Sequence, residues 1–222
     1  MKLEEILKRC DHTLLDRCAA WEDIRQTLDD GIKYNTASAC IPSCYVREAK
    51  EYVGERLKIC TVIGFPNGYS STESKLAECR QALLDGADEI DTVVNLCDVK
   101  SKRYERVLDE LRALKEICAD KILKVIIETC LLSTEEKLEL CRVVTKSGAD
   151  YIKTSTGFSH GGATGDDVRL LRENVGKEVK VKAAGGISSL ADAELFISLG
   201  ADRLGTSRIV KLAKNITSEE GY

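Results

Sequence analysis

The sequence predicts a closed barrel of eight parallel strands that alternate with helices, the (β/α)8 class. Three observations support this class. Short apolar and β-branched runs alternate with longer charged stretches of helical period along the chain. One short motif recurs before every second predicted strand. Finally, 222 residues, 43% of them apolar and 32% charged, are enough for a single barrel domain over residues 1–222, and two prolines leave no long linker.

The expected elements follow in order, beginning with a short amphipathic N-terminal helix over residues 1–6. The predicted strands are the short apolar runs 10–15, 34–40, 58–64, 89–95, 123–129, 151–155, 179–183 and 203–205. The Leu-rich, charged stretches between them include the predicted helices 73–84, 104–118, 134–146 and 190–199. Strands that are separated by helices imply a parallel sheet.

The recurring motif is Gly-Ala-Asp followed by a strand. It begins at Gly86, Gly148 and Gly200, with a weaker copy around Gly31. Each glycine follows a helical pattern, where a left-handed C-cap is favoured. The copies precede the second, fourth, sixth and eighth predicted strands, so the repeating unit is a doubled β/α pair. This favours the barrel over the alternative, an open doubly wound sheet, whose Gly-x-Gly-x-x-Gly fingerprint after the first strand is absent.

Composition narrows the range of partners. A net charge of -4 argues against a general nucleic-acid or anionic-membrane binder. No apolar run approaches the ~20 residues of a membrane span, and the first residues are unlike a signal peptide, so a soluble cytoplasmic protein is expected. The ten cysteines are evenly spread without a Cys-x-x-Cys pair, and there are two histidines. We therefore expect small buried thiols in a reducing compartment and no metal site.

Two mid-strand lysines are the strongest chemical signal. Active sites of (β/α)8 barrels lie at the carboxyl ends of the strands, and Lys153 and Lys182 stand near those ends in the sixth and seventh predicted strands. Adjacent strands lie ~5 Å apart, so repulsion and desolvation are expected to lower the pKa of at least one lysine. A neutral lysine forms Schiff bases with carbonyl compounds. The alternative is that both lysines point to solvent between helices.

A carboxylate and several glycine loops complete the predicted site. Asp91 shares one strand face with Val93 and Asn95, so it could relay protons for the lysines or form a buried salt bridge with them. Glycines follow the sixth, seventh and eighth predicted strands, and the last two loops lead into helices, whose free N–H groups favour an anion such as phosphate. This combination is typical of a class I, or Schiff-base, aldolase.

The chain resembles the deoxyribose-phosphate aldolase family from about residue 10 to residue 210. The matching motifs are Asp-His-Thr-Leu-Leu at 11–15, Glu-Ile-Asp-Thr-Val-Val-Asn at 89–95, Lys-Val-Ile-Ile-Glu-Thr at 124–129, Tyr-Ile-Lys-Thr-Ser-Thr-Gly-Phe at 151–158, Gly-Gly-Ala-Thr at 161–164, Lys-Ala-Ala-Gly-Gly-Ile at 182–187 and Gly-Thr-Ser at 205–207. The resemblance implies reversible cleavage of 2-deoxy-D-ribose 5-phosphate to D-glyceraldehyde 3-phosphate and acetaldehyde, without a metal or other cofactor.

Residue by residue, the resemblance makes Lys153 the Schiff-base lysine, Lys182 the lysine that perturbs it and Asp91 the carboxylate of the proton relay. It implies pocket-lining roles for Asp11, Thr13, Leu15 and Cys40, and a phosphate cradle of Gly157, Gly185, Gly186, Gly205 and Ser207. Ser188 stands where many members of the family have arginine, so Arg208 is expected to supply that charge.

Several alternatives stay open on the sequence. The function could be that of another Schiff-base sugar-phosphate aldolase or transaldolase, or of a non-catalytic phosphate-binding barrel. The expected partner is a small-molecule substrate, and the sequence leaves a homodimer or larger homo-oligomer open. At the C-terminus, Tyr222 either belongs to a frayed end or doubles back to reach the site as a proton donor.

Overall fold

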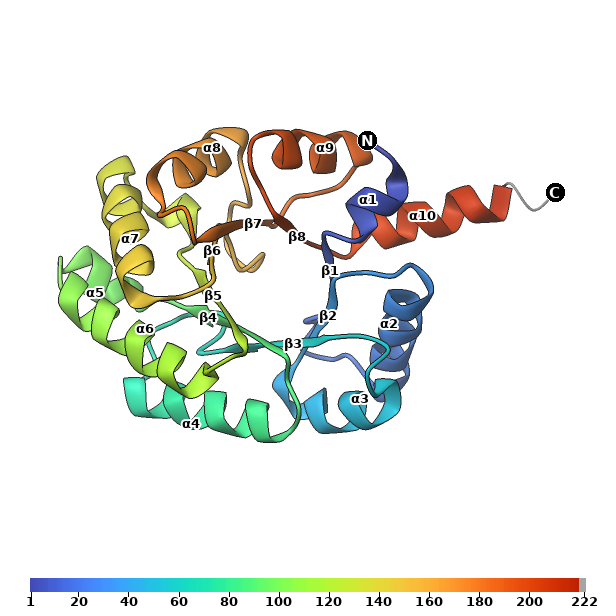
Figure 1. The fold of residues 1–222 in the computed structure, drawn as a ribbon, viewed down its shortest axis with the longest axis horizontal. Helices are drawn as coiled ribbons and strands as arrows, with labels where there is room; N and C mark the ends of the chain where they lie inside the picture. Colours follow the sequence, from blue (N-terminus) through green and yellow to red (C-terminus); the bar gives the residue numbers. More distant parts are fainter. Residues whose placement is uncertain (220–222) are drawn as a thin grey trace.

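Eight parallel strands form a closed barrel in the computed structural model, which describes residues 1–219 (Figure 1). Each strand pairs with the next, and β8 pairs with β1, so the open sheet is excluded. The strands are β1 (Cys10–Thr13), β2 (Ser38–Ile41), β3 (Ile59–Ile63), β4 (Glu89–Val93), β5 (Ile122–Ile126), β6 (Tyr151–Lys153), β7 (Lys180–Ala184) and β8 (Arg203–Thr206). The predicted fold class is confirmed. The predicted roles of Tyr222 lie outside the described residues.

Helices surround this barrel, as Figure 1 shows. They are α1 (Leu3–Leu7), α2 (Trp21–Lys33), α3 (Val46–Val53), α4 (Thr72–Leu84), α5 (Leu96–Lys100), α6 (Tyr104–Cys118), α7 (Thr134–Ser147), α8 (Gly165–Asn174), α9 (Leu190–Ser198) and α10 (Arg208–Glu219), with short 3-10 turns η1 (Ser43–Tyr45) and η2 (Thr129–Leu131). The four predicted later helices are observed as α4, α6, α7 and α9, each within one residue of its expected bounds. No helix in residues 1–219 is both long and apolar enough to cross a membrane.

The second strand begins later than predicted. Gly31 lies inside α2, and the chain turns out of that helix at Asn35, whose φ is 49°. Asparagine tolerates the left-handed conformation better than most residues because its short polar side chain can bond locally. The prediction that Gly31 ends a helix was therefore wrong, and β2 starts at Ser38 rather than at residue 34.

The three strong copies of the Gly-Ala-Asp motif have a common physical role. Their glycines adopt φ values of 101°, 79° and 103°, the left-handed region that releases the chain from a helix. The aspartate of each copy then accepts a backbone N–H near the start of the preceding strand. These hydrogen bonds join Asp88 to Ile59 at 2.9 Å, Asp150 to Leu123 at 2.8 Å and Asp202 to Val181 at 2.9 Å. The motif thus ends a helix and fixes the register of neighbouring strands.

The apolar core lies between the strands and the helices rather than inside the barrel. Outward residues of β5, Leu123 and Val125, belong to this core together with Leu111 of α6 and Leu140 of α7. Because side chains alternate along a strand, Lys124 between them points into the barrel. Barrel interiors are usually filled with branched apolar residues, whereas this interior holds a set of buried charged side chains.

Candidate active site

Seven charged residues inside the barrel form one connected set, here called the charged cluster. They are Asp11 of β1, Glu89 and Asp91 of β4, Lys124 of β5, Lys153 of β6, Lys182 of β7 and Arg203 of β8. All seven come from strands, whose backbones are fixed by the ladder of the barrel. The cluster is therefore held in place by rigid elements rather than by loops.

Asp91 lies at the centre of the charged cluster. Its Oδ2 accepts hydrogen bonds from Nζ of Lys153 and from Nζ of Lys182, both at 2.7 Å, and its Oδ1 accepts from Nζ of Lys124 at 2.8 Å. Cys60 Sγ, at 3.2 Å, also donates to Oδ1. Burial alone would raise the pKa of Asp91, but the three lysines hold it well below its ordinary value. Asp91 is an ionised carboxylate that contacts three lysines.

Lys182 pairs with Lys153 in strand register, as the sequence predicted. Its ammonium group donates to Asp11 as well as to Asp91. Burial opposes the charge of Lys182, but these two carboxylates outweigh it and raise the pKa above its ordinary value. The expectation that at least one of the two lysines has a lowered pKa is not met at Lys182, because Asp91 lies between the two lysines and Asp11 adds a second carboxylate. Lys182 stays protonated.

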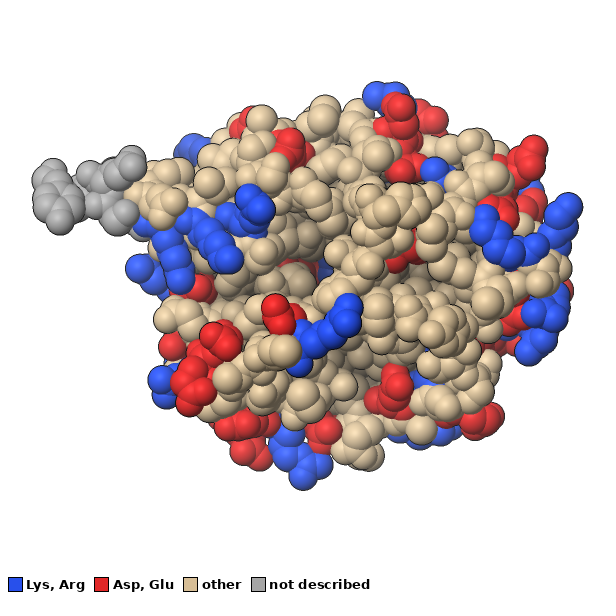
Figure 2. Space-filling view, turned by 180° about the vertical axis from the view of Figure 1, so that it is seen from behind, with Lys and Arg blue, Asp and Glu red and all other residues tan. Residues whose placement is uncertain are grey.

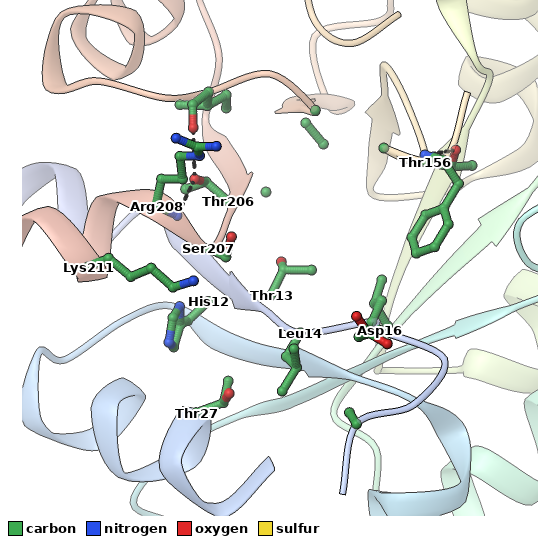
Figure 3. A pocket seen from close by; sticks show the side chains of 18 of the residues that line it. His12, Thr13, Leu14, Asp16, Thr27, Thr156, Thr206, Ser207, Arg208 and Lys211 are labelled. Carbon is green, nitrogen blue, oxygen red and sulfur yellow. Dashed lines mark hydrogen bonds between the residues drawn. The ribbon is translucent and has the colours of Figure 1, made fainter. Parts of the chain in front are cut away.

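A cavity of about 1180 Å³ adjoins the charged cluster, and Figure 3 shows many of the residues that line this cavity. Within residues 1–219, Lys153 is the one cluster member that lines it. Figure 2 shows a hollow near the middle of one face, with lysine and arginine side chains on the side of the C-terminal helix. On α10, the cavity is lined by Arg208, Lys211 and Lys214. The lysine amine of Lys153 thus meets a cavity that has cations along one wall.

Glycines form the loops of the cavity wall next to Lys153. Gly157, Gly185 and Gly186 line the cavity with φ values of 84°, 83° and 77°, which L side chains rarely adopt. At Gly205 the reason for a glycine differs. A Cβ there would lie 2.9 Å from Cβ of Ala184 and 3.2 Å from Cε of Lys182. Gly205 therefore leaves the space through which the Lys182 side chain reaches the cluster.

Most of the residues expected around the substrate line the cavity, and two do not. The cavity wall includes Thr13, Leu15, Gly157, Gly185, Gly186, Gly205, Ser207 and Arg208. Asp11 and Cys40 are fully buried beneath it. Asp11 is a member of the charged cluster, and its carboxylate accepts hydrogen bonds from Ser38, Lys182 and Arg203.

Sequence reasoning missed the roles of Lys124, Glu89 and Arg203. Lys124 Nζ lies 2.6 Å from Glu89 Oε2, and Arg203 lies 3.2 Å from the same carboxylate oxygen. The signal was available for Lys124, which interrupts an apolar strand in the same way as Lys153. The partners of Arg203 depend on strand register, which no local pattern of the sequence specifies.

Two overlapping groups in the cluster have ligating atoms close enough to share a metal ion. They are Cys40, Cys60 and Asp91, and Asp11, Cys60 and Glu89. Every carboxylate in these groups already contacts a lysine or arginine of the chain. Side-chain cations therefore stand where a metal ion would have to bind.

The fold and the site together define a class of protein. A (β/α)8 barrel with a buried lysine–carboxylate cluster that reaches a glycine-lined cavity through one lysine is an aldolase barrel of the lysine-dependent kind. The chain belongs to the DeoC/LacD family of aldolases, whose model matches residues 6–202. The family resemblance in the sequence is confirmed.

Named relatives agree with this assignment over the full length of the chain. The deoxyribose-phosphate aldolase of Streptococcus agalactiae serotype Ia is 60% identical over 221 residues, covering 100% of this chain and 99% of that protein. The deoxyribose-phosphate aldolase of Clostridium botulinum is 57% identical and covers 100% of both chains. Among solved structures, the tetrameric deoxyribose phosphate aldolase of Aeropyrum pernix is 33% identical with a TM-score of 0.88, covering 98% of this chain and 93% of that one.

Proposed function

We propose that the protein is a class I aldolase that reversibly cleaves 2-deoxy-D-ribose 5-phosphate to D-glyceraldehyde 3-phosphate and acetaldehyde. One observation carries this proposal. Lys153 is the cluster lysine that lines the cavity, and its amine is 2.7 Å from the carboxylate of Asp91. An amine that faces a cavity and has a proton acceptor beside it suits addition to an aldehyde.

In the proposed reaction, the Lys153 amine adds to the C1 aldehyde of the open-chain sugar, and loss of water gives a protonated imine. The imine withdraws electrons from the C2–C3 bond. That bond breaks as the C3 hydroxyl gives up its proton, and C3 becomes the aldehyde carbon of glyceraldehyde 3-phosphate. The electron pair left on C2 forms an enamine. Protonation at C2 and hydrolysis of the imine then release acetaldehyde and restore the lysine.

Asp91 and Lys182 serve this reaction as a proton relay. Asp91 Oδ2 contacts both lysine Nζ atoms, so a proton can pass between Lys153 and the rest of the cluster through one oxygen. The high pKa of Lys182, which Asp11 and Asp91 sustain against burial, keeps a positive charge next to Asp91 throughout. Asp91, directly or through a water molecule, receives the proton of the C3 hydroxyl.

The phosphate is bound by the glycine loops and by the start of α10. Gly157, Gly185, Gly186 and Gly205 give close backbone approach, and Ser207 and Arg208 add a hydroxyl and a charge at a helix N-terminus. Contacts to a phosphate remote from C2 and C3 orient the reacting carbons.

Borohydride trapping tests the proposal. Reduction of the imine in the presence of 2-deoxyribose 5-phosphate should fix a covalent adduct on Lys153, identified by mass spectrometry of a digest. Lys153→Leu should lose both the adduct and turnover while remaining folded. An adduct on Lys182, or none, would contradict the assignment. Acetaldehyde among the products separates this reaction from that of another Schiff-base aldolase or a transaldolase.

We also propose that the enzyme acts in the cytoplasm as a homo-oligomer. All ten cysteines are free thiols, which suits a reducing compartment. The Aeropyrum pernix relative is described as a tetramer. Cell fractionation tests the cytoplasmic location, and light scattering of the purified protein tests whether it forms a homo-oligomer.

A further inference from the structure

Glu128 has an unusual backbone conformation directly after β5. Its φ of 55° and ψ of 66° are left-handed, a region that disfavours residues with a side chain. The residue is also 3% exposed. A long acidic residue persists in such a conformation where the surrounding structure imposes it, and residues of this kind concentrate at functional sites.

The Glu128 carboxylate contacts one neighbouring loop. It accepts the backbone N–H of Thr156, at 3.2 Å to Oε1 and 3.3 Å to Oε2, and the hydroxyl of Thr156 at 2.5 Å. Oγ1 of Thr156 in turn accepts the backbone N–H of Phe158 at 3.0 Å. Among residues 1–219 no lysine or arginine forms an ion pair with Glu128, so donors of this loop stabilise the buried carboxylate.

The loop that Glu128 holds belongs to the cavity, although Glu128 itself does not line it. Thr156, Gly157 and Phe158 are part of the cavity wall and follow Lys153 by a few residues. Figure 3 shows Thr156 across the cavity from Ser207 and Arg208. A group bound between these two sides would therefore depend on where the loop at 156–158 stands.

We propose that Glu128 is a positioning residue for substrate phosphate. Its carboxylate fixes the loop at 156–158 so that the backbone of Gly157 faces the phosphate bound by the opposite wall. The left-handed backbone at Glu128 folds the side chain back under the loop instead of into the cavity. This role rests on the proposed aldolase function, and it makes a separate statement: Glu128 acts on phosphate recognition and not on imine chemistry.

Glu128→Gln is the primary test. Glutamine keeps the shape of the side chain and one acceptor for the Thr156 backbone N–H, but its NH2 group cannot accept the Thr156 hydroxyl. A hydrogen bond to a charged group corresponds to roughly a tenfold to hundredfold change. We expect KM for 2-deoxyribose 5-phosphate to rise by about tenfold or more, while kcat/KM for unphosphorylated 2-deoxyribose changes by less than about threefold.

Thr156→Val gives a second route to the same measurement, should Glu128→Gln not fold. It removes the hydroxyl that joins Glu128 to Phe158 and retains the branched shape. The same selective rise in KM is expected. The double variant should have a KM no higher than that of the more impaired single variant, because both changes remove one shared interaction.

Asp150→Asn is the matched control. Asp150 joins the same two strands, β5 and β6, at their opposite end, where its Oδ2 accepts from Leu123 N and from Lys115 Nζ, each at 2.8 Å. This variant should lose stability without changing the ratio of kcat/KM for 2-deoxyribose 5-phosphate to kcat/KM for 2-deoxyribose. Equal losses on both substrates in Glu128→Gln, or lower stability with an unchanged KM, would overturn the positioning role. Failure of borohydride trapping in the unaltered protein would instead refute the aldolase function.

Discussion

Lys124→Met tests whether the charged cluster sets the ionisation of Asp91. Lys124 is 0% exposed, and its Nζ lies 2.8 Å from Asp91 Oδ1, 2.6 Å from Glu89 Oε2 and 3.6 Å from Asp11 Oδ2. Methionine fills a similar volume with an unbranched apolar chain and carries no charge. The substitution thus removes one cation from three buried carboxylates while leaving little empty space.

Two effects of Lys124→Met are expected, a fall in Tm and a shift in the pH dependence of kcat. Removing one partner of a buried ion pair costs about 3–5 kcal/mol, and in a chain of this size each kcal/mol lowers Tm by roughly 2–4 °C. We therefore expect Tm to fall by about 6–20 °C. Burial raises the pKa of Asp91, and Lys124 is foremost among the groups that lower it. Without Lys124 the pKa of Asp91 should rise, so the acid limb of the pH–kcat profile should move to higher pH.

The sign of the stability effect follows from the same shift. Because the pKa of folded Asp91 lies below its unfolded value, the contribution of Asp91 to stability is complete above the unfolded pKa and is lost as pH falls through the folded pKa. In Lys124→Met this loss should begin at higher pH. Thermal unfolding and initial rates across a pH series measure the two effects separately.

Lys75→Met is the matched control. Lys75 is also 0% exposed, and its Nζ lies 2.7 Å from Glu110 Oε1 and 2.8 Å from the carbonyl oxygen of Val93, outside the charged cluster. Both variants should lose stability, but only Lys124→Met should shift the acid limb. Identical pH profiles for the two variants would refute the view that Lys124 controls Asp91.

Four further outcomes are expected. Arg208→Ala should raise KM for 2-deoxyribose 5-phosphate about tenfold to hundredfold, with a smaller effect on 2-deoxyribose; equal effects in steady-state assays would make Arg208 structural. Gly205→Ala should cost about 1–3 kcal/mol in urea unfolding and lower kcat, because the added Cβ meets Ala184 and displaces Lys182. Burial chiefly lowers the pKa of His12 from 6.5 to about 4. Stability should therefore fall by about 3 kcal/mol as pH decreases from 6.5 to 4, at about 1.4 kcal/mol per pKa unit, and His12→Gln should flatten this dependence. Exhaustive chelation should leave the rate of acetaldehyde release unchanged, because the imine serves as the electron sink.

The fold followed from the sequence because its signals are local and repeated. Hydrophobic periodicity located the strands, and Gly86, Gly148 and Gly200 marked helix ends that the structure confirms. The error at the second strand has a local cause as well. Asn35 performs there what glycine performs elsewhere, and Gly31 is an ordinary helical residue.

The arrangement of the site was only partly predictable. Strand alternation, together with the place of barrel active sites at the carboxyl ends of the strands, was enough to predict that Lys153, Lys182 and Asp91 lie close together. The sign of the pKa shift of Lys182 was not predictable, because it depends on Asp11, which lies on β1 and reaches Lys182 only when the barrel closes. Local patterns can identify which residues are buried charges, but closure of the barrel decides which of them are paired.

The ion pairs of the charged cluster also distinguish Lys153 from the other cations. Within residues 1–219 the cluster holds four cations, Lys124, Lys153, Lys182 and Arg203, against three carboxylates, Asp11, Glu89 and Asp91. Lys124 and Lys182 each contact at least two of the carboxylates, whereas Lys153 contacts Asp91 alone. A covalent change at Lys153 would therefore disturb fewer ion pairs than one at Lys124 or Lys182. Among the described residues, Lys153 is also the one lysine of the charged cluster that lines the cavity, where the proposed imine would have to form.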